Sequence, residues 1–139
     1  MNPVQNSRKN RHSSKRGVAV VELAVCLPVL TLITLATIEA SAMIFLQQSL
    51  SIAAYEGARV SLVPDATEEN ARYQAELILT GRDVVGASVN VTPSNFESSS
   101  SGTWIQIETS APFAQNSLAG GWLFNGHTLS ASVEMMKEQ

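Results

Sequence analysis

The feature that most constrains this chain is an uncharged apolar stretch close to its beginning. Between Leu23 and Ile38 there is no Asp, Glu, Lys or Arg, and the apolar character extends back to Val18 with one carboxylate, Glu22, inside it. Taken as one helix, residues 18–38 span about 32 Å at ~1.5 Å per residue, which is enough to cross a hydrocarbon core ~30 Å thick. The sequence therefore predicts a helical membrane anchor.

Charge is divided unevenly on the two sides of this stretch. Five Lys or Arg residues and no acid precede Gly17, whereas all twelve acidic residues and only four Lys or Arg follow it. The net charge of −3 thus separates into +5 before Gly17 and −8 after it. By the positive-inside rule, residues 1–17 stay in the cytoplasm as a basic leader and the acidic remainder crosses the membrane. The remainder lacks the basic patch typical of proteins that bind nucleic acid.

Beyond residue 39 the apolar residues continue on one side of the helix only. They recur at helical spacing, opposite a polar face. We therefore expect residues 18–39 to lie in the membrane and residues 40–63, the distal half of the same helix, to pack on a soluble head. The expected apolar stripe comprises Met43, Leu46, Leu50, Ala53, Gly57 and Val60.

Two residues, Gly57 and Glu39, are unusual at their positions in this helix. Glycine inside a helix costs about 1 kcal/mol relative to alanine, so Gly57 indicates that a sheet approaches the helix closely there. Glu39 stands where the apolar stretch ends, and we expect it to be a solvated residue at the membrane boundary rather than a contact to a partner.

Residues 64–139 predict an exported α+β head. After Pro64, a second helix is expected, capped by Asp65 or Thr67 and ended by Gly81. The period of the apolar residues then changes to two in three segments, 87–92, 104–108 and 129–135. Such alternation predicts three half-buried strands of an antiparallel sheet with one polar face. We expect the aromatic residues of the connection 110–126 to cover the edge of the core.

The sequence contains no recognisable catalytic set. Cys26 is the single cysteine, so an intramolecular disulfide is impossible, and we expect it to be a small apolar residue. His12 and His127 have no second His or Cys nearby in the sequence, and neither a Gly-x-Ser-x-Gly motif nor a phosphate-binding loop is present. We therefore expect no metal, no cofactor and no enzymatic activity.

Two motifs resemble one family. The segment K-R-G-V-A-V-V-E resembles the processing site of type IV pilins and pseudopilins, in which a prepilin peptidase cuts after the glycine. A cut between Gly17 and Val18 would leave Glu22 fifth in the mature chain. The segment I-A-A-Y-E-G-A-R at residues 52–59 is similar to the A-A-x-E-G-A-R of TadE-like proteins, the small pseudopilins of the tight-adherence (Tad) pilus. Family members often carry an aromatic residue where this chain has Leu23.

The resemblance implies a pilin-like fold and a role in pilus assembly. Its implied partners are a prepilin peptidase, other pilins and pseudopilins, pilus assembly proteins and the lipid bilayer. Its implied location is the bacterial inner membrane, with a cytoplasmic N-terminus and the head outside. Cleavage would give Val18 a free amine, and Glu22 could then pair with the Val18 amine of a neighbouring subunit and set the stagger between helices.

Other interpretations remain open at this point. The chain could be an uncleaved single-span protein whose exported domain binds a partner or ligand. It could also be a secreted protein cut near Ala42, where small residues follow the apolar stretch. Glu22 could simply be solvated at the level of the lipid headgroups.

Overall fold

A computed structural model describes residues 11–121, 124 and 126–137, with side chains described from residue 17 onward. Its main elements follow one another in the order α1, α2, β1, β2, β3, and two short 3-10 turns, η1 at Phe96–Ser98 and η2 at Phe113–Gln115, flank β2. The chain divides after Ala36 into two compact units, of which the second contains residues 37–139.

Helix α1 comprises Arg11–Ser61 and carries Pro28 in its interior. We expected it to begin at Val18, but it begins seven residues earlier in the sequence, inside the basic leader. Arg and Lys are good helix formers, and no proline lies between residues 11 and 18, so the backbone stays helical through Gly17. The end of α1 lies two residues before the expected position at residue 63.

Helix α2 comprises Glu68–Gly81, as the sequence predicts. Its N-cap is Thr67, whose side chain accepts a hydrogen bond from the backbone N–H of Asn70, and the Asn70 side chain in turn bonds to the backbone of Thr67. This reciprocal arrangement satisfies backbone donors that a helix start otherwise leaves unpaired.

Three strands form one antiparallel sheet in the order β1-β2-β3. They are β1 at Ser88–Thr92, β2 at Trp104–Pro112 and β3 at Thr128–Met136, so the α+β prediction is confirmed. Strand β2 is four residues longer than predicted, because its inward alternation continues through a polar residue, Thr109. The buried Thr109 hydroxyl donates a hydrogen bond to the carbonyl of Leu50 at 2.9 Å. Because the hydroxyl has this partner, the free-energy cost of burying it is small.

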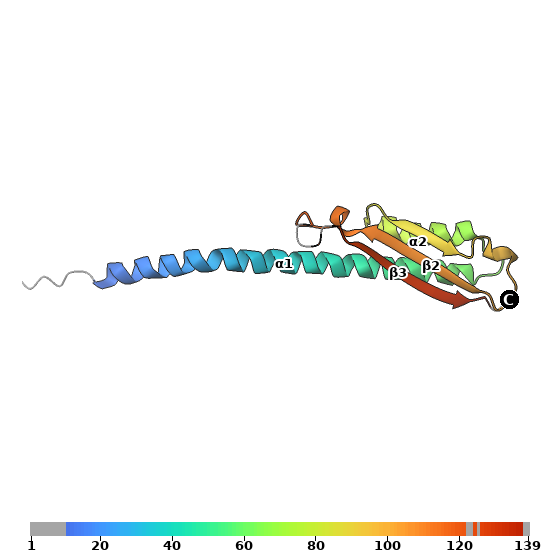
Figure 1. Cartoon of the computed structure of the whole chain (residues 1–139), viewed down its shortest axis with the longest axis horizontal. Helices are drawn as coiled ribbons and strands as arrows, with labels where there is room; N and C mark the ends of the chain where they lie inside the picture. Colours follow the sequence, from blue (N-terminus) through green and yellow to red (C-terminus); the bar gives the residue numbers. More distant parts are fainter. Residues whose placement is uncertain (1–10, 122–123, 125, 138–139) are drawn as a thin grey trace, which may run out of the picture. The chain divides into compact units, whose positions relative to one another are not determined.

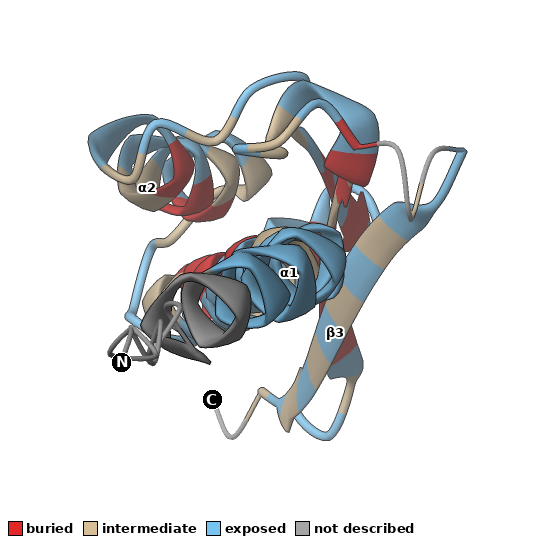
Figure 2. Ribbon diagram, turned by 90° about the vertical axis from the view of Figure 1, so that its left-hand side faces the viewer, coloured by how far each residue is buried: buried red, intermediate tan, exposed pale blue. Residues whose placement is uncertain are grey.

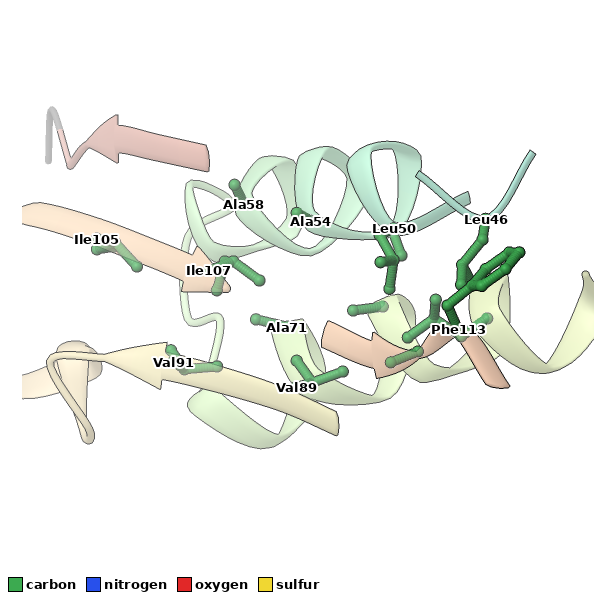
Figure 3. Close-up of a cluster of buried hydrophobic side chains, with 14 of the residues drawn as sticks. Leu46, Leu50, Ala54, Ala58, Ala71, Val89, Val91, Ile105, Ile107 and Phe113 are labelled. Atoms are coloured by element: carbon green, nitrogen blue, oxygen red, sulfur yellow. The ribbon is translucent and has the colours of Figure 1, made fainter. Parts of the chain in front are cut away.

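The core of the second unit lies where the distal half of α1, α2 and the sheet meet (Figures 1 and 3). Figure 2 shows the buried residues on the facing sides of these elements and only half-buried or exposed residues on β3. Most of the side chains that α1 and α2 place in this core are alanines, so the backbones of the two helices and of the sheet can approach one another closely. The buried side chains include Leu46, Leu50, Ala53, Ala54, Ala58, Ala71, Ala75, Val89, Val91, Ile105, Ile107 and Phe113.

Gly57 is the point of closest approach. A Cβ atom on this residue would lie 3.1 Å from the backbone oxygen of Ala71, 3.2 Å from Cβ of Ala75 and 3.3 Å from Cγ2 of Ile107. The predicted approach of the sheet is therefore confirmed, and α2 approaches the same glycine as well. Any side chain here must push on two elements at once, which explains why the helix tolerates the propensity cost of glycine.

Candidate functional site

The first unit presents an apolar surface on every side of its helix. From Gly17 to Thr34 each residue of α1 is exposed, and the large apolar side chains among them are 51 % to 68 % exposed. Residues 17–61 form a helix long and apolar enough, by length and composition, to cross a membrane. A helix that is apolar all round is typical of a lipid-facing span or of a buried core helix, and this one is not buried by its own chain.

Polar groups within the apolar stretch are satisfied locally. The hydroxyl of Thr31 donates to the carbonyl of Leu27, and that of Thr34 donates to the carbonyl of Leu30, each at 2.8 Å. Each threonine thus bonds to its own helix, which suits a hydrocarbon environment, where no water is available as a partner. Cys26 is a free, exposed cysteine among these residues.

The three residues singled out by the sequence lie together on α1. Gly17 is exposed, and nothing lies within 4 Å of a Cβ atom built on it. Val18 and Glu22 are four residues apart, so they share one face of the helix. The side chain of Glu22 is exposed and has no hydrogen bond or ion pair to any described side chain.

Glu39 contradicts the expectation of a solvated boundary residue. It is fully buried, and its Oε1 accepts hydrogen bonds from the Ser117 hydroxyl at 2.6 Å and from the Gly121 backbone N–H at 3.0 Å. Its Oε2 has no partner among the described residues. The prediction was wrong because the chain returns to α1 more than seventy residues later, which the local pattern of residues 30–40 does not indicate.

The segment that returns to Glu39 comprises residues 116–121, and we call it the Glu39 loop. The first residue of the loop, Asn116, is held by three hydrogen bonds. Its side-chain amide donates to the carbonyls of Val85 and Pro112 at 2.9 Å, and its side-chain oxygen accepts from the Val85 N–H at 2.8 Å. Gly121 adopts a positive φ of 68°, a conformation that turns its N–H toward the carboxylate at little cost for glycine. The glycine pair at 120–121 was the one sequence signal for this turn.

Aromatic residues beside the Glu39 loop complete the core. Phe113 is fully buried, and its ring meets that of Phe124 edge-to-face with centroids 6.0 Å apart. For these two residues the expectation that the connection covers the core is confirmed. Trp122, which belongs to the same connection, lies outside the described residues.

The two edges of the sheet each receive a side chain from a helix. Arg72 of α2 donates to the carbonyl of Val89 on β1 at 3.0 Å, and Gln47 of α1 donates to the carbonyl of Ser130 on β3 at 2.9 Å. Such contacts reduce the number of free backbone groups that could pair with another strand. Among the described residues, no group of three or more His, Cys, Asp or Glu is placed to hold a metal ion.

The apolar stretch and the motif at residues 52–59 belong to one helix, α1. Residues 17–59 match the TadE-like protein family. The predicted resemblance is therefore confirmed over this segment. The TadE-like segment begins at Gly17 and ends at Arg59, so it contains the second motif, the part of the first motif from Gly17 to Glu22, and the exposed apolar stretch from Gly17 to Thr34. No curated protein and no solved structure matches the chain.

Proposed function

We propose that this chain is a membrane-anchored pseudopilin or minor pilin that takes part in assembly of a Tad (type IV-like) pilus and has no catalytic activity. The observation that carries the proposal is that the TadE-like segment includes the part of α1, Gly17 to Thr34, whose apolar side chains are exposed all round. The charge asymmetry supports an inner-membrane location with the N-terminus in the cytoplasm and the head outside. In this proposal, residues 1–17 are the leader, 18–39 the span, 40–63 the distal half of the helix and 64–139 the head.

The proposal includes cleavage between Gly17 and Val18 by a prepilin peptidase. The open surroundings of Gly17 support it, because none of the described residues lies within 4 Å of a Cβ atom built on Gly17. The test is the intact mass of protein extracted from membranes of the natural host. A form that begins at Val18 is expected, and Gly17→Leu should yield only the full-length form. A wild-type protein recovered at full length would identify an uncleaved anchor instead, and one cut near Ala42 would identify a secreted protein.

Glu22 is proposed to guide assembly by pairing with the Val18 amine of a neighbouring subunit. A carboxylate in the span costs roughly 2.5–3.5 kcal/mol near mid-membrane and less near an interface, so a cationic partner at the same depth stabilises it. Its lack of a partner among the described residues supports a partner in a second subunit. The shared face of Val18 and Glu22 allows adjacent subunits to make the same contact in succession.

The Glu22 proposal is tested by substitution in the host. Glu22→Ala is expected to leave cleavage and membrane insertion intact and to reduce pilus-dependent adherence. The matched control is Glu56→Ala, which removes an acid from the same helix that is already paired with Arg59 at 3.3 Å. Adherence at the wild-type level in Glu22→Ala would remove Glu22 from the mechanism, whatever the outcome for cleavage.

A further inference from the structure

Leu118 is the most exposed of the large apolar residues that the structure describes. Its exposed fraction is 78 %, although it lies in the Glu39 loop, which is hydrogen-bonded to Val85 of the head and to Glu39 of α1. Ser117, the residue before it, is held by Glu39, and Gly121, three residues after it, is held by the same carboxylate. Because both sides are fixed, Leu118 cannot easily swing inward to bury itself.

The surroundings of Leu118 place it near the end of the apolar stretch. It lines a groove of about 580 Å³ together with Ser41, Ala42 and Phe45 of α1. These helix residues lie three to seven positions beyond Ile38, the last residue of the uncharged stretch, which is about 4.5–10.5 Å along a helix axis. The interfacial layer of a bilayer adds ~5–7 Å on each side of the hydrocarbon core. In the proposed membrane anchoring, the α1 residues that line the groove with Leu118 therefore lie at the level of the headgroup layer.

The composition of this end of the head suits such a position. No Asp, Glu, Lys or Arg occurs from Thr109 to Val133, so the loop carries no charge that must be kept in bulk water. Phe45, on the same groove, is 51 % exposed, and the Arg82 guanidinium lies 5.9 Å from the centre of its ring. A guanidinium over an aromatic ring is favourable, and a basic residue at this level is attracted to the anionic lipids of a membrane surface. Asp83 is the acidic residue of this groove.

We propose that the Glu39 loop is a second membrane contact, in which Leu118 and Phe45 enter the boundary between the lipid headgroups and acyl chains. This inference rests on the proposed membrane anchoring by α1 and adds a contact made by the head itself. Its partner is the lipid bilayer, because Leu118 lines a groove with Ser41, Ala42 and Phe45, which follow shortly after the apolar stretch in a helix long and apolar enough to cross a membrane. A head held by both α1 and Leu118 would be restricted in rotation about the helix, and its outward surface would keep one orientation to the membrane.

Fluorescent labelling of the full-length protein tests this contact. In a Cys26→Ala background, Leu118→Cys is labelled with an environment-sensitive fluorophore. The protein is then reconstituted in vesicles of phosphatidylethanolamine and phosphatidylglycerol at a high lipid-to-protein ratio. We expect blue-shifted emission, quenching by lipids with a nitroxide near the headgroup, and protection from aqueous iodide. The matched control is Ser101→Cys, an exposed residue in the turn before β2, which should be quenched by iodide only.

Labelling of the native Cys26 separates this inference from the proposed function. If Cys26 is quenched by lipid nitroxides and position 118 behaves like position 101, the anchor stands and the loop contact is wrong. If Cys26 is not quenched by lipid either, the membrane anchoring itself is wrong. Protection of position 118 from iodide without quenching by lipid would mean that protein covers it, and this outcome also overturns the proposal. Ser117→Ala should weaken lipid quenching at position 118, because it removes one of the bonds that hold the loop.

Discussion

Replacing Glu39 by alanine is expected to release the Glu39 loop from α1 while the sheet stays folded. The substitution removes two hydrogen bonds to a buried carboxylate, from the Ser117 hydroxyl at 2.6 Å and the Gly121 N–H at 3.0 Å. Hydrogen bonds to charged groups contribute roughly 1.5–3 kcal/mol each. Two effects offset part of this loss: the Gly121 N–H keeps a bond to the Ser117 oxygen at 2.6 Å, and a buried carboxylate with one unpaired oxygen no longer has to be desolvated.

The net loss for opening of the loop is therefore about 1.5–3 kcal/mol, which corresponds to a roughly 10- to 150-fold increase in local opening. Amide hydrogen exchange in the peptide that contains residues 116–121 measures it, with the full-length protein in vesicles or micelles. Glu39→Gln keeps an acceptor oxygen but loses the charge, and neutral hydrogen bonds are about half as strong, so its exchange should be intermediate. Glu56→Ala, which removes a half-buried acid of the same helix that is paired with Arg59 instead, should leave exchange in this peptide unchanged.

The reasoning would be refuted if exchange in residues 116–121 were the same in Glu39→Ala as in the wild type. It would also be refuted if exchange in β2 and β3 increased as much as exchange in the loop, because Glu39 would then support the whole head rather than one loop. A faster exchange in Glu39→Gln than in Glu39→Ala would mean that the shape of the buried site matters more than the acceptor.

Three further predictions concern the stability of the second unit. Gly57→Ala should lower the free energy of unfolding by about 1 kcal/mol, because crowding at 3.1–3.3 Å outweighs the helix-propensity gain. The control is Gly81→Ala, where nothing lies within 4 Å of the added Cβ, so that it should lower the free energy of unfolding by less. Chemical denaturation of both variants measures the difference. Phe113→Ala should cost about 3–5 kcal/mol, since the ring is fully buried, and a fall of less than ~1 kcal/mol in the same assay would contradict its core role. The hydrogen bond from Arg72 lowers the pKa of Glu68 below its ordinary value of 4.5. Because the folded pKa is depressed, this stabilisation is present above the ordinary pKa and is lost as pH falls through the folded value. Unfolding curves between pH 6 and pH 3, within the pH range where carboxylates titrate, should therefore be less pH-dependent in Glu68→Gln than in the wild type.

The fold was predictable from the sequence wherever one local period identified an element. The spacing of Leu46 and Leu50 identified the packed half of α1, and alternation such as Ile105 and Ile107 identified the strands. The extension of β2 was missed because Thr109 is polar, and only the distant carbonyl of Leu50 makes its burial favourable. The start of α1 was missed because the basic leader lacks the apolar period, although its residues are compatible with a helix.

For the candidate site, the sequence singled out Gly17, Val18 and Glu22 from one local motif, and their roles in cleavage and assembly stay predictions. Glu39 was interpreted correctly as the end of the apolar stretch and wrongly as solvated. Its burial depends on Ser117 and on residues that follow it, and a contact across more than seventy residues has no signature in the spacing around either partner. The glycine pair of the loop indicated a turn but not the group toward which it turns.

We expect the two acids that flank the apolar stretch to have different roles, one in contacts between subunits and one in the folding of a single chain. Glu22 is exposed and lacks a partner among the described residues, so its contribution depends on a second subunit and should vanish when subunits are dilute in the membrane. Glu39 is buried and already holds two donors from its own chain, so its contribution should be present in a single dilute subunit. A comparison of Glu22→Ala and Glu39→Ala at high and low protein-to-lipid ratio therefore separates assembly from folding. If loop exchange in Glu39→Ala changed only at high density, the loop would be held by a neighbour, and the intramolecular role of Glu39 would have to be abandoned.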